Sequence, residues 1–134
     1  MAFEESLRNI SLAADATLAG YTGVPGLPGS ASPNSGKQYC FVKVTGESTV
    51  GLADADDGLV IGVMQNKPQV TGQAATVAIR GVSFVVAGDT ITAGEQVSPE
   101  NTTGRAIPLT AGHTLAGTAL TGGADGELIS VLLA

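Results

Sequence analysis

Short apolar runs, separated by glycine, aspartate, asparagine and proline, make up the chain from Lys37 onward. Runs of this length between such breakers are typical of antiparallel strands. The pattern predicts an all-β fold, either a small antiparallel β-barrel or a sandwich, because both need the same alternation. The expected strands are Tyr39–Thr45, Ser48–Leu52, Val60–Gln65, Ala75–Arg80, Ser83–Ala87, Gln96–Ser98, Arg105–Pro108, His113–Leu120 and Leu128–Leu133.

The first part of the chain has a different pattern. Residues 1–20 carry apolar side chains loosely spaced as on one helix face, with two glutamates early in the segment, so a short helix and an extended arm both fit. Residues 21–36 hold too many glycines and prolines for regular structure, which predicts a linker or a long surface loop. We therefore expect an N-terminal arm (1–20), a Gly/Pro-rich loop (21–36) and a β domain (37–134).

Two segments of the β domain resemble each other. VIGVMQNKPQVTGQAATVAI (60–79) and LAGTALTGGADGELISVLL (115–133) each place apolar residues before a glycine, then a polar turn, a second glycine and a valine five residues later. The matching positions predict two similar hairpins, although a glycine-rich β protein also offers such matches by coincidence.

Length, composition and charge indicate a single domain and argue against nucleic-acid binding. The chain has 134 residues, enough for one ordinary domain with one core, and only 13% of them are charged. It carries 12 acidic against 6 basic residues, a formal charge of −6, with no cluster of lysine or arginine. An acidic surface repels phosphate backbones, so we expect no direct nucleic-acid partner.

The single cysteine and the hydropathy give further expectations. Cys40 lies between Tyr39 and Phe41, which predicts a buried structural thiol in a strand. The sequence lacks the roughly 18 consecutive apolar residues of a membrane span, and its acidic start is unlike a secretory signal. We therefore expect no membrane partner, and synthesis in a cytoplasm.

Each candidate catalytic, metal-binding or phosphate-binding site in the sequence lacks residues that it would need. His113 is the only histidine and begins a predicted strand. This position favours a partly exposed polar side chain over a catalytic acid or base. The carboxylates of ADADDG (53–58) are spaced as in part of a calcium loop, but the required glycine and glutamate are replaced by Leu59 and Gln65. Phosphate-binding glycine motifs are absent, and Asp89, Glu95 and Glu100 lie in turn-like contexts. We expect no enzyme, no metal and no cofactor.

The stretch from Val60 to Ala106 resembles the phage capsid cement, or head decoration, family. Its members share an IGV strand, a G-x-x-x-x-V-x-[IL]-x-G strand, an A-G-x-x-I-x-A-G-x-x-V segment and a G-R-A turn. These motifs correspond here to residues 61–63, 72–81, 87–97 and 104–106. The closing VGxAL-type strand corresponds to residues 116–120, where Thr118 departs from the usual order, and the resemblance covers residues 37–134.

The resemblance implies a structural virion protein on the outer surface of an assembled phage capsid. Such a protein bridges major capsid subunits, stabilises the shell by mass action and forms a symmetric oligomer, for which we expect a homotrimer. Within that function, a mobile apolar segment can order on a neighbour. We therefore expect the N-terminal arm to contact the capsid through Phe3, Leu7, Ile10 and Leu12.

Two other structural roles stay open. A phage fibre or tail component also fits a glycine-rich β sequence with an arm, although such proteins usually show longer repeats. A small carbohydrate-binding module on the virion surface would need an aromatic stacking platform. The chain has no tryptophan, and its two tyrosines are Tyr21 in the loop and Tyr39 in a strand.

Overall fold

The structure is a computed structural model that describes residues 7–18, 37–56, 59–68 and 70–134, and all regular elements among these residues are strands. The all-β prediction is confirmed. No helix of the described residues is long and apolar enough to cross a membrane. The strands are β1 (Arg8–Ala14), β2 (Phe41–Gly46), β3 (Thr49–Leu52), β4 (Val60–Met64), β5 (Ala74–Arg80), β6 (Val82–Val86), β7 (Gln96–Pro99), β8 (Ala106–Pro108), β9 (Gly117–Ala119) and β10 (Leu128–Leu133).

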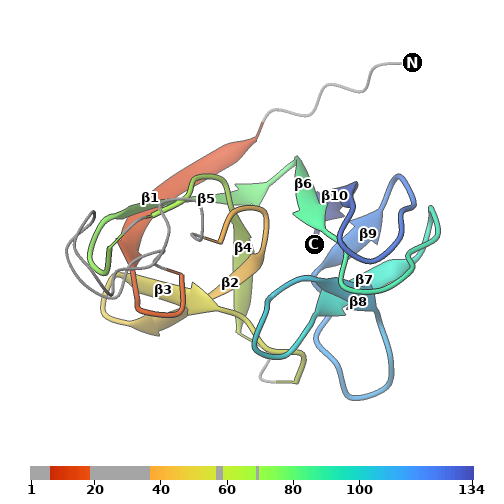
Figure 1. Cartoon of the computed structure of the whole chain (residues 1–134), viewed down its shortest axis with the longest axis horizontal. Helices are drawn as coiled ribbons and strands as arrows, with labels where there is room; N and C mark the ends of the chain where they lie inside the picture. The colour runs from red at the N-terminus through yellow and green to blue at the C-terminus, as the bar shows by residue number, and fades with distance from the viewer. Residues whose placement is uncertain (1–6, 19–36, 57–58, 69) are drawn as a thin grey trace, which may run out of the picture.

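The first half of the fold is a closed five-stranded barrel with the order β1-β3-β2-β4-β5 (Figure 1). Its neighbouring strands run antiparallel except β1 and β3, which pair in parallel. Strand β1 closes the barrel by pairing with β5 from Arg8 opposite Arg80 to Ala13 opposite Ala74. Closure removes the exposed sheet edges that an open five-stranded sheet would present.

Strand β1 corrects the expectation for the N-terminal segment. A helix is wrong for residues 8–14, because their backbone is bonded to β3 and β5 on its two sides. The segment expected to be an arm therefore supplies one barrel strand. Phe3 and the Gly/Pro-rich loop expected at 21–36 lie outside the described residues.

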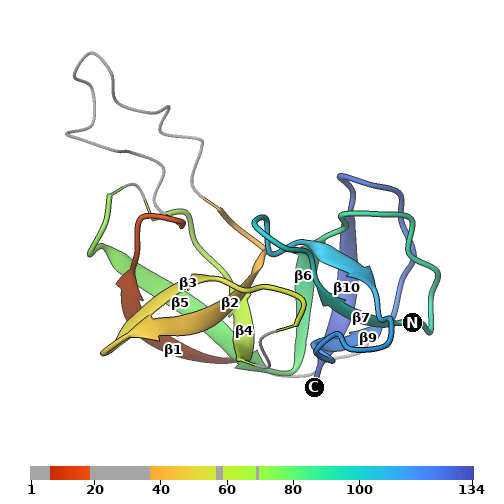
Figure 2. The ribbon, with the colours of Figure 1, turned by 90° about the horizontal axis from the view of Figure 1, so that it is seen from below.

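The second half is a five-stranded sheet with the order β6-β10-β9-β7-β8, which lies beside the barrel (Figures 1 and 2). Its two edge strands approach each other where Ala87, just after β6, bridges Ala106 in β8, and the Gly88 N–H donates to the Ala106 carbonyl at 2.7 Å. The sheet therefore curls, with one face turned inward and the other outward.

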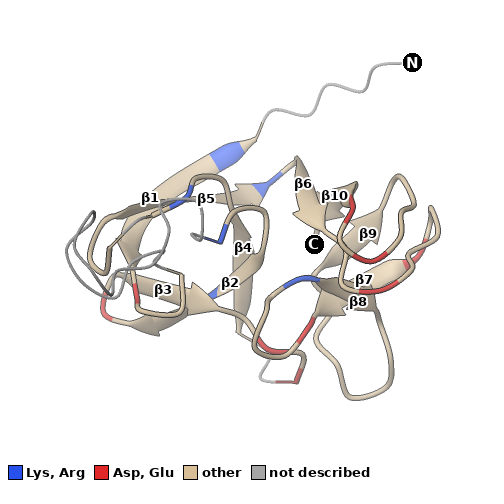
Figure 3. Cartoon of the chain, in the orientation of Figure 1, with Lys and Arg blue, Asp and Glu red and all other residues tan. Residues whose placement is uncertain are grey.

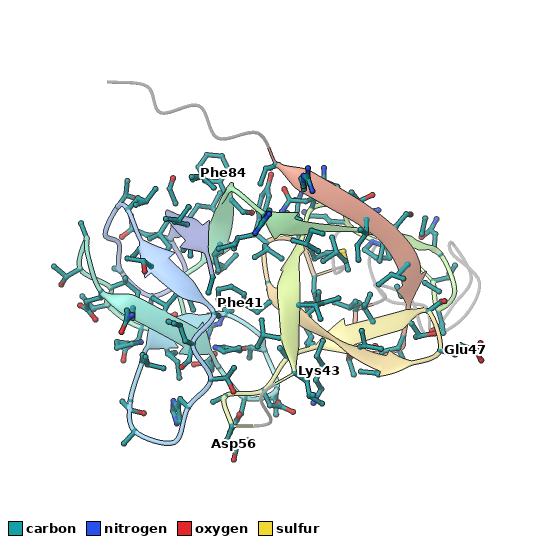
Figure 4. The ribbon with its side chains drawn as sticks, turned by 180° about the vertical axis from the view of Figure 1, so that it is seen from behind. Phe41, Lys43, Glu47, Asp56 and Phe84 are labelled. Atoms are coloured by element: carbon teal, nitrogen blue, oxygen red, sulfur yellow. The ribbon has the colours of Figure 1, made fainter. Side chains whose placement is uncertain are left out.

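Two hydrophobic clusters hold the described residues together, where composition suggested one core. The barrel cluster contains Cys40, Val42, Met64 and Val77 among others. The junction cluster joins Phe41 and Val63 of the barrel to the inner face of the second sheet. Successive side chains of a strand point to opposite faces, so β2 and β4 can serve both clusters. Phe41 lies between the two halves (Figure 4), fully buried.

The two similar hairpins expected from the internal resemblance are confirmed. Strands β4 and β5 pair antiparallel, as do β9 and β10. Gly62 faces the Ala78 carbonyl and Val77 across its hairpin, and Gly117 faces the Leu132 carbonyl and Val131 in the same arrangement. Each pair thus repeats one close packing of a glycine against the following strand.

One predicted strand is mostly wrong. Of residues 113–120, only Gly117–Ala119 forms a strand. The chain turns first, because the His113 N–H bonds to the Thr110 carbonyl at 3.1 Å and Gly112 has a φ of 85°.

Candidate interaction surface

The outward face of the second sheet is apolar over three neighbouring strands. In β10, the buried Ile129 and Val131 alternate with exposed leucines, and in β6 the buried Ser83 and Val85 alternate with outward apolar side chains. The strand register places these outward side chains next to one another. We name this set the outer face; it consists of Val82, Phe84, Val86, Leu120, Leu128 and Leu132.

The outer face is open to solvent. The exposed fractions are 54% for Phe84, 51% for Leu128 and 44% for Leu132. Its only polar neighbours on these strands are Ser130 and Thr118, and no outward position of β6, β9 or β10 is charged. A contiguous exposed apolar patch marks an interaction site more often than scattered single residues do.

The ring of Phe84 has a fixed support. The Tyr39 ring packs edge-on against it, with centroids 5.9 Å apart and planes at 71°. Tyr39 is held in turn, because its carbonyl accepts from the Val86 N–H at 2.9 Å and its N–H donates to the Met64 carbonyl at 2.8 Å. Phe84 is thus an exposed but supported aromatic side chain on the surface (Figure 4), a type enriched at protein interfaces.

The predicted capsid contacts fall on β1, apart from Leu7 just before it and Phe3 outside the described residues. Leu7 and Ile10 are both 38% exposed, whereas Leu12 packs against the barrel cluster. Because Ile10 and Leu12 lie opposite the buried Val77 and Ala75, their side chains point to the same side of the sheet as those residues. A capsid contact by these residues stays a prediction.

The G-R-A turn has a structural role. Gly104 has a φ of 66° and lies so close to the Phe41 carbonyl that a Cβ would be 2.6 Å from its oxygen. Arg105 donates from Nε and Nη2 to one Glu100 oxygen at 3.1 and 3.0 Å, and from Nη1 to Asp125 at 3.1 Å. The turn therefore joins the barrel, the β7–β8 connection and the turn before β10.

The first carboxylate of the ADADDG loop, Asp54, stabilises the fold through hydrogen bonds. Asp54 accepts from Lys43 Nζ at 3.0 Å and from the Thr102 N–H at 3.1 Å. The Thr102 hydrogen bond, followed by that from Lys43, holds the pKa of Asp54 below its ordinary value. Among the described residues, no group of three or more histidine, cysteine or carboxylate side chains is arranged to hold a metal ion.

These bonds predict a pH-dependent stability. Because the pKa of Asp54 is lowered by folding, its contribution is complete above the unfolded value, about 3.9, and is lost as pH falls through the lower folded value. The side chain is 38% exposed, so solvent screens the pair, and we expect Asp54→Ala to cost about 0.5–1 kcal/mol at pH 7.

Urea unfolding of the wild type and Asp54→Ala from pH 7 to pH 2 measures this effect. The gap between the two proteins should close at the acid end. Asp56→Ala, in the same loop, is the matched control and should leave stability unchanged. A gap for Asp54→Ala of equal size at pH 2 would show that the charge of this carboxylate does not stabilise the fold.

Cys40 and His113, the other two residues considered from the sequence, both have structural roles. Cys40 is 5% exposed, which confirms the buried thiol, and burial raises its pKa. Its predicted place in a strand is wrong, because β2 begins one residue later, at Phe41. His113 Nδ1 lies 3.0 Å from Thr110 Oγ1 and 3.3 Å from Ser98 Oγ, and Ser98 is fully buried. The histidine therefore ties the 110–113 turn to β7.

A small hollow lies where β4 and β5 meet the end of β10. Its lining side chains are aliphatic, so the hollow offers no side-chain hydrogen bond with which to orient a small ligand. It is lined by Val60, Ile61, Gly62, Ile79, Leu115, Ala116, Leu133 and Ala134.

The comparisons with known proteins give a likeness at the level of structure. No protein-family model and no curated protein matches the chain. Among solved structures, the chain is similar to the N base of the head fiber gp8.5 of bacteriophage phi29, with a TM-score of 0.58 and 15% sequence identity. The likeness covers 96% of this chain and 95% of the other. At this identity it shows a shared fold.

Proposed function

We propose that this chain is a structural component of a phage head, which decorates the outside of the assembled capsid and stabilises it by bridging major capsid subunits. The observation that carries the proposal is the fold shared with a phage head-fiber base over nearly the whole of both chains. The motifs between Val60 and Ala106, which resemble those of capsid cement proteins, support it independently.

Bridging gives the proposal a physical mechanism. A protein that binds the assembled lattice but not separated subunits adds its binding free energy to that of the shell. Many copies, each bound modestly, then resist the pressure of the packaged genome. The protein needs no catalytic site for this role, only surfaces that match neighbouring capsid subunits.

The test is to mix the purified protein with undecorated expanded heads and with dissociated capsid subunits, and to measure bound protein by sedimentation. We expect stoichiometric binding to heads, little binding to separated subunits, and heads that break open at a higher temperature. Absence of binding to heads would refute the proposal.

A fibre base is the second candidate, favoured by the named role of the structural neighbour. A fibre base anchored on one capsid subunit would bind separated subunits as well as heads, and would leave the breaking temperature of heads unchanged. A carbohydrate-binding module has less support, because Tyr39, the one tyrosine that the structure describes, packs its ring edge-on against Phe84.

We also propose that copies of the chain associate as a homotrimer, with the outer face at the contact between copies. A contact with the capsid alone would leave this apolar face open until the protein met a head, whereas a contact between copies covers it at once. The absence of charge on its outward positions suits association between copies that each carry a net charge of −6.

Phe84→Asp tests the contact between copies. A carboxylate at the centre of the outer face would have to be buried unpaired, so we expect association between copies to weaken by at least about 100-fold, at roughly 3 kcal/mol or more. Light scattering after size exclusion should change from the mass of three chains to that of one. Val44→Asp, at an exposed valine of the barrel, is the control. An unchanged mass for Phe84→Asp would contradict the assignment.

A further inference from the structure

Two arginines lie directly opposite each other where the barrel closes. Arg8 at the start of β1 is the register partner of Arg80 at the end of β5, and both side chains are exposed. Figure 3 colours a basic stretch on β1 and another at the end of β5, and the register places these two ends next to each other. Like charges directly opposite each other across an antiparallel pair are destabilising.

The chain has ample acidic residues with which to neutralise them, with 12 acidic against 6 basic residues. Lys43 and Arg105 are each bonded to carboxylates. Within the described part of the chain, neither Arg8 nor Arg80 has a carboxylate partner. The fold therefore holds a concentrated positive charge on an otherwise acidic protein.

The surroundings of the pair are those of a docking surface. Gly81 follows Arg80 with a φ of 98° and turns the chain directly into β6, so the pair lies beside the outer face. Leu7 precedes Arg8 and is exposed. Because the outer face is assigned to the contact between copies, the pair lies at the rim of that contact, and such a rim stays accessible to solvent and open to a further partner.

We propose that the Arg8–Arg80 pair binds an acidic segment displayed on the outer surface of the capsid. This inference rests on the proposed function and assigns it a partner chemistry. Guanidinium groups form paired hydrogen bonds with carboxylates, and two of them side by side match two neighbouring carboxylates better than isolated lysines would. A nucleic acid would extend beyond the pair over the acidic remainder of the surface, which would repel it, whereas a short acidic segment contacts the pair alone.

The experiment compares variants for binding to undecorated heads. Arg8→Gln with Arg80→Gln should weaken binding by about tenfold or more, the loss of one or two charge-assisted hydrogen bonds, and should reduce the salt dependence of binding. Arg8→Lys with Arg80→Lys keeps the charge and should give an intermediate loss. Lys37→Gln with Lys67→Gln changes the net charge by the same amount as the double glutamine variant of the arginines and should bind like the wild type.

Folding and self-association are measured on the same variants without heads. The glutamine variants should melt at the wild-type temperature or above it, because a repulsion has been removed, and should keep the wild-type mass. A double glutamine variant that binds heads like the wild type would overturn the inference, as would one that loses its oligomeric mass, which would assign the pair to a second copy. Wild-type protein that fails to bind heads would instead refute the proposed function.

Discussion

Replacing Phe41 with alanine is expected to lower the free energy of unfolding by about 3–5 kcal/mol. The side chain is completely buried and belongs to the junction cluster, where it projects from β2 toward the second sheet. Its backbone is bonded on both sides, because the Phe41 N–H donates to the Gly104 carbonyl at 2.7 Å and its carbonyl accepts from the Ala53 N–H at 3.0 Å. The cavity therefore opens where the surrounding chain is least free to collapse.

Equilibrium unfolding in urea measures the loss, and the chain supplies a matched control. Val44→Ala truncates a barrel side chain that is 48% exposed and lies outside the outer face, so we expect a loss of at most about 1 kcal/mol. Because Phe41 joins the two halves, its loss should also separate their unfolding transitions. A loss below about 1 kcal/mol for Phe41→Ala would contradict the assignment of this residue as the link between the halves.

Turn chemistry explains why much of the β domain could be predicted. Gly72, Gly94 and Gly126 have φ values of 88°, 94° and 88°, a conformation that glycine adopts without steric cost. Each is followed by Gln or Glu, whose N–H closes the turn to the carbonyl three residues earlier. At Glu95 and Glu127 the side chain also accepts from the N–H at the start of the turn. These local signals place β5, β7 and β10 correctly.

Strand β1 was missed because its partners are distant in the sequence. Leu7 and Ile10 are spaced as on a helix, but Ile10 and Leu12 also alternate with the polar Asn9 and Ser11, which is the strand signal. The alternation alone cannot identify its partners. Strand β1 pairs with β5, roughly 60 to 70 residues later, and in parallel with β3, and neither pairing has a local signature.

The outer face was missed for a different reason. In the segments VSFVV (82–86) and LISVLL (128–133), apolar residues occupy both sets of alternating positions, so both faces of each strand carry apolar side chains. This pattern is typical of strands buried on both faces. One face of each is indeed buried, yet Phe84 and Leu128 are about half exposed. The sequence does not show which face is covered, because that depends on how the second sheet curls against the barrel.

The equivalent glycines of the two hairpins should both be intolerant of a single added carbon. A Cβ at Gly62 would lie 2.0 Å from the Ala78 carbonyl oxygen, and a Cβ at Gly117 would lie 2.6 Å from that of Leu132. The obstacle in both cases is the backbone of a paired strand, which cannot move without breaking its hydrogen bonds. We expect Gly62→Ala and Gly117→Ala each to cost about 3 kcal/mol or more.

Gly46→Ala is the control for both substitutions. It lies at the end of β2 within the barrel, and the nearest atom to its added Cβ would be Thr49 Cβ at an ordinary 3.6 Å. A glycine with room for a methyl group commonly gains about 0.4–1 kcal/mol on substitution, because the unfolded chain loses freedom. Urea unfolding of the three variants should therefore give changes of opposite sign, and a Gly62→Ala variant as stable as Gly46→Ala would mean that β4 and β5 do not approach this closely. Equal losses at Gly62 and Gly117 would confirm that the two hairpins repeat one packing arrangement, as the matching sequence positions predict.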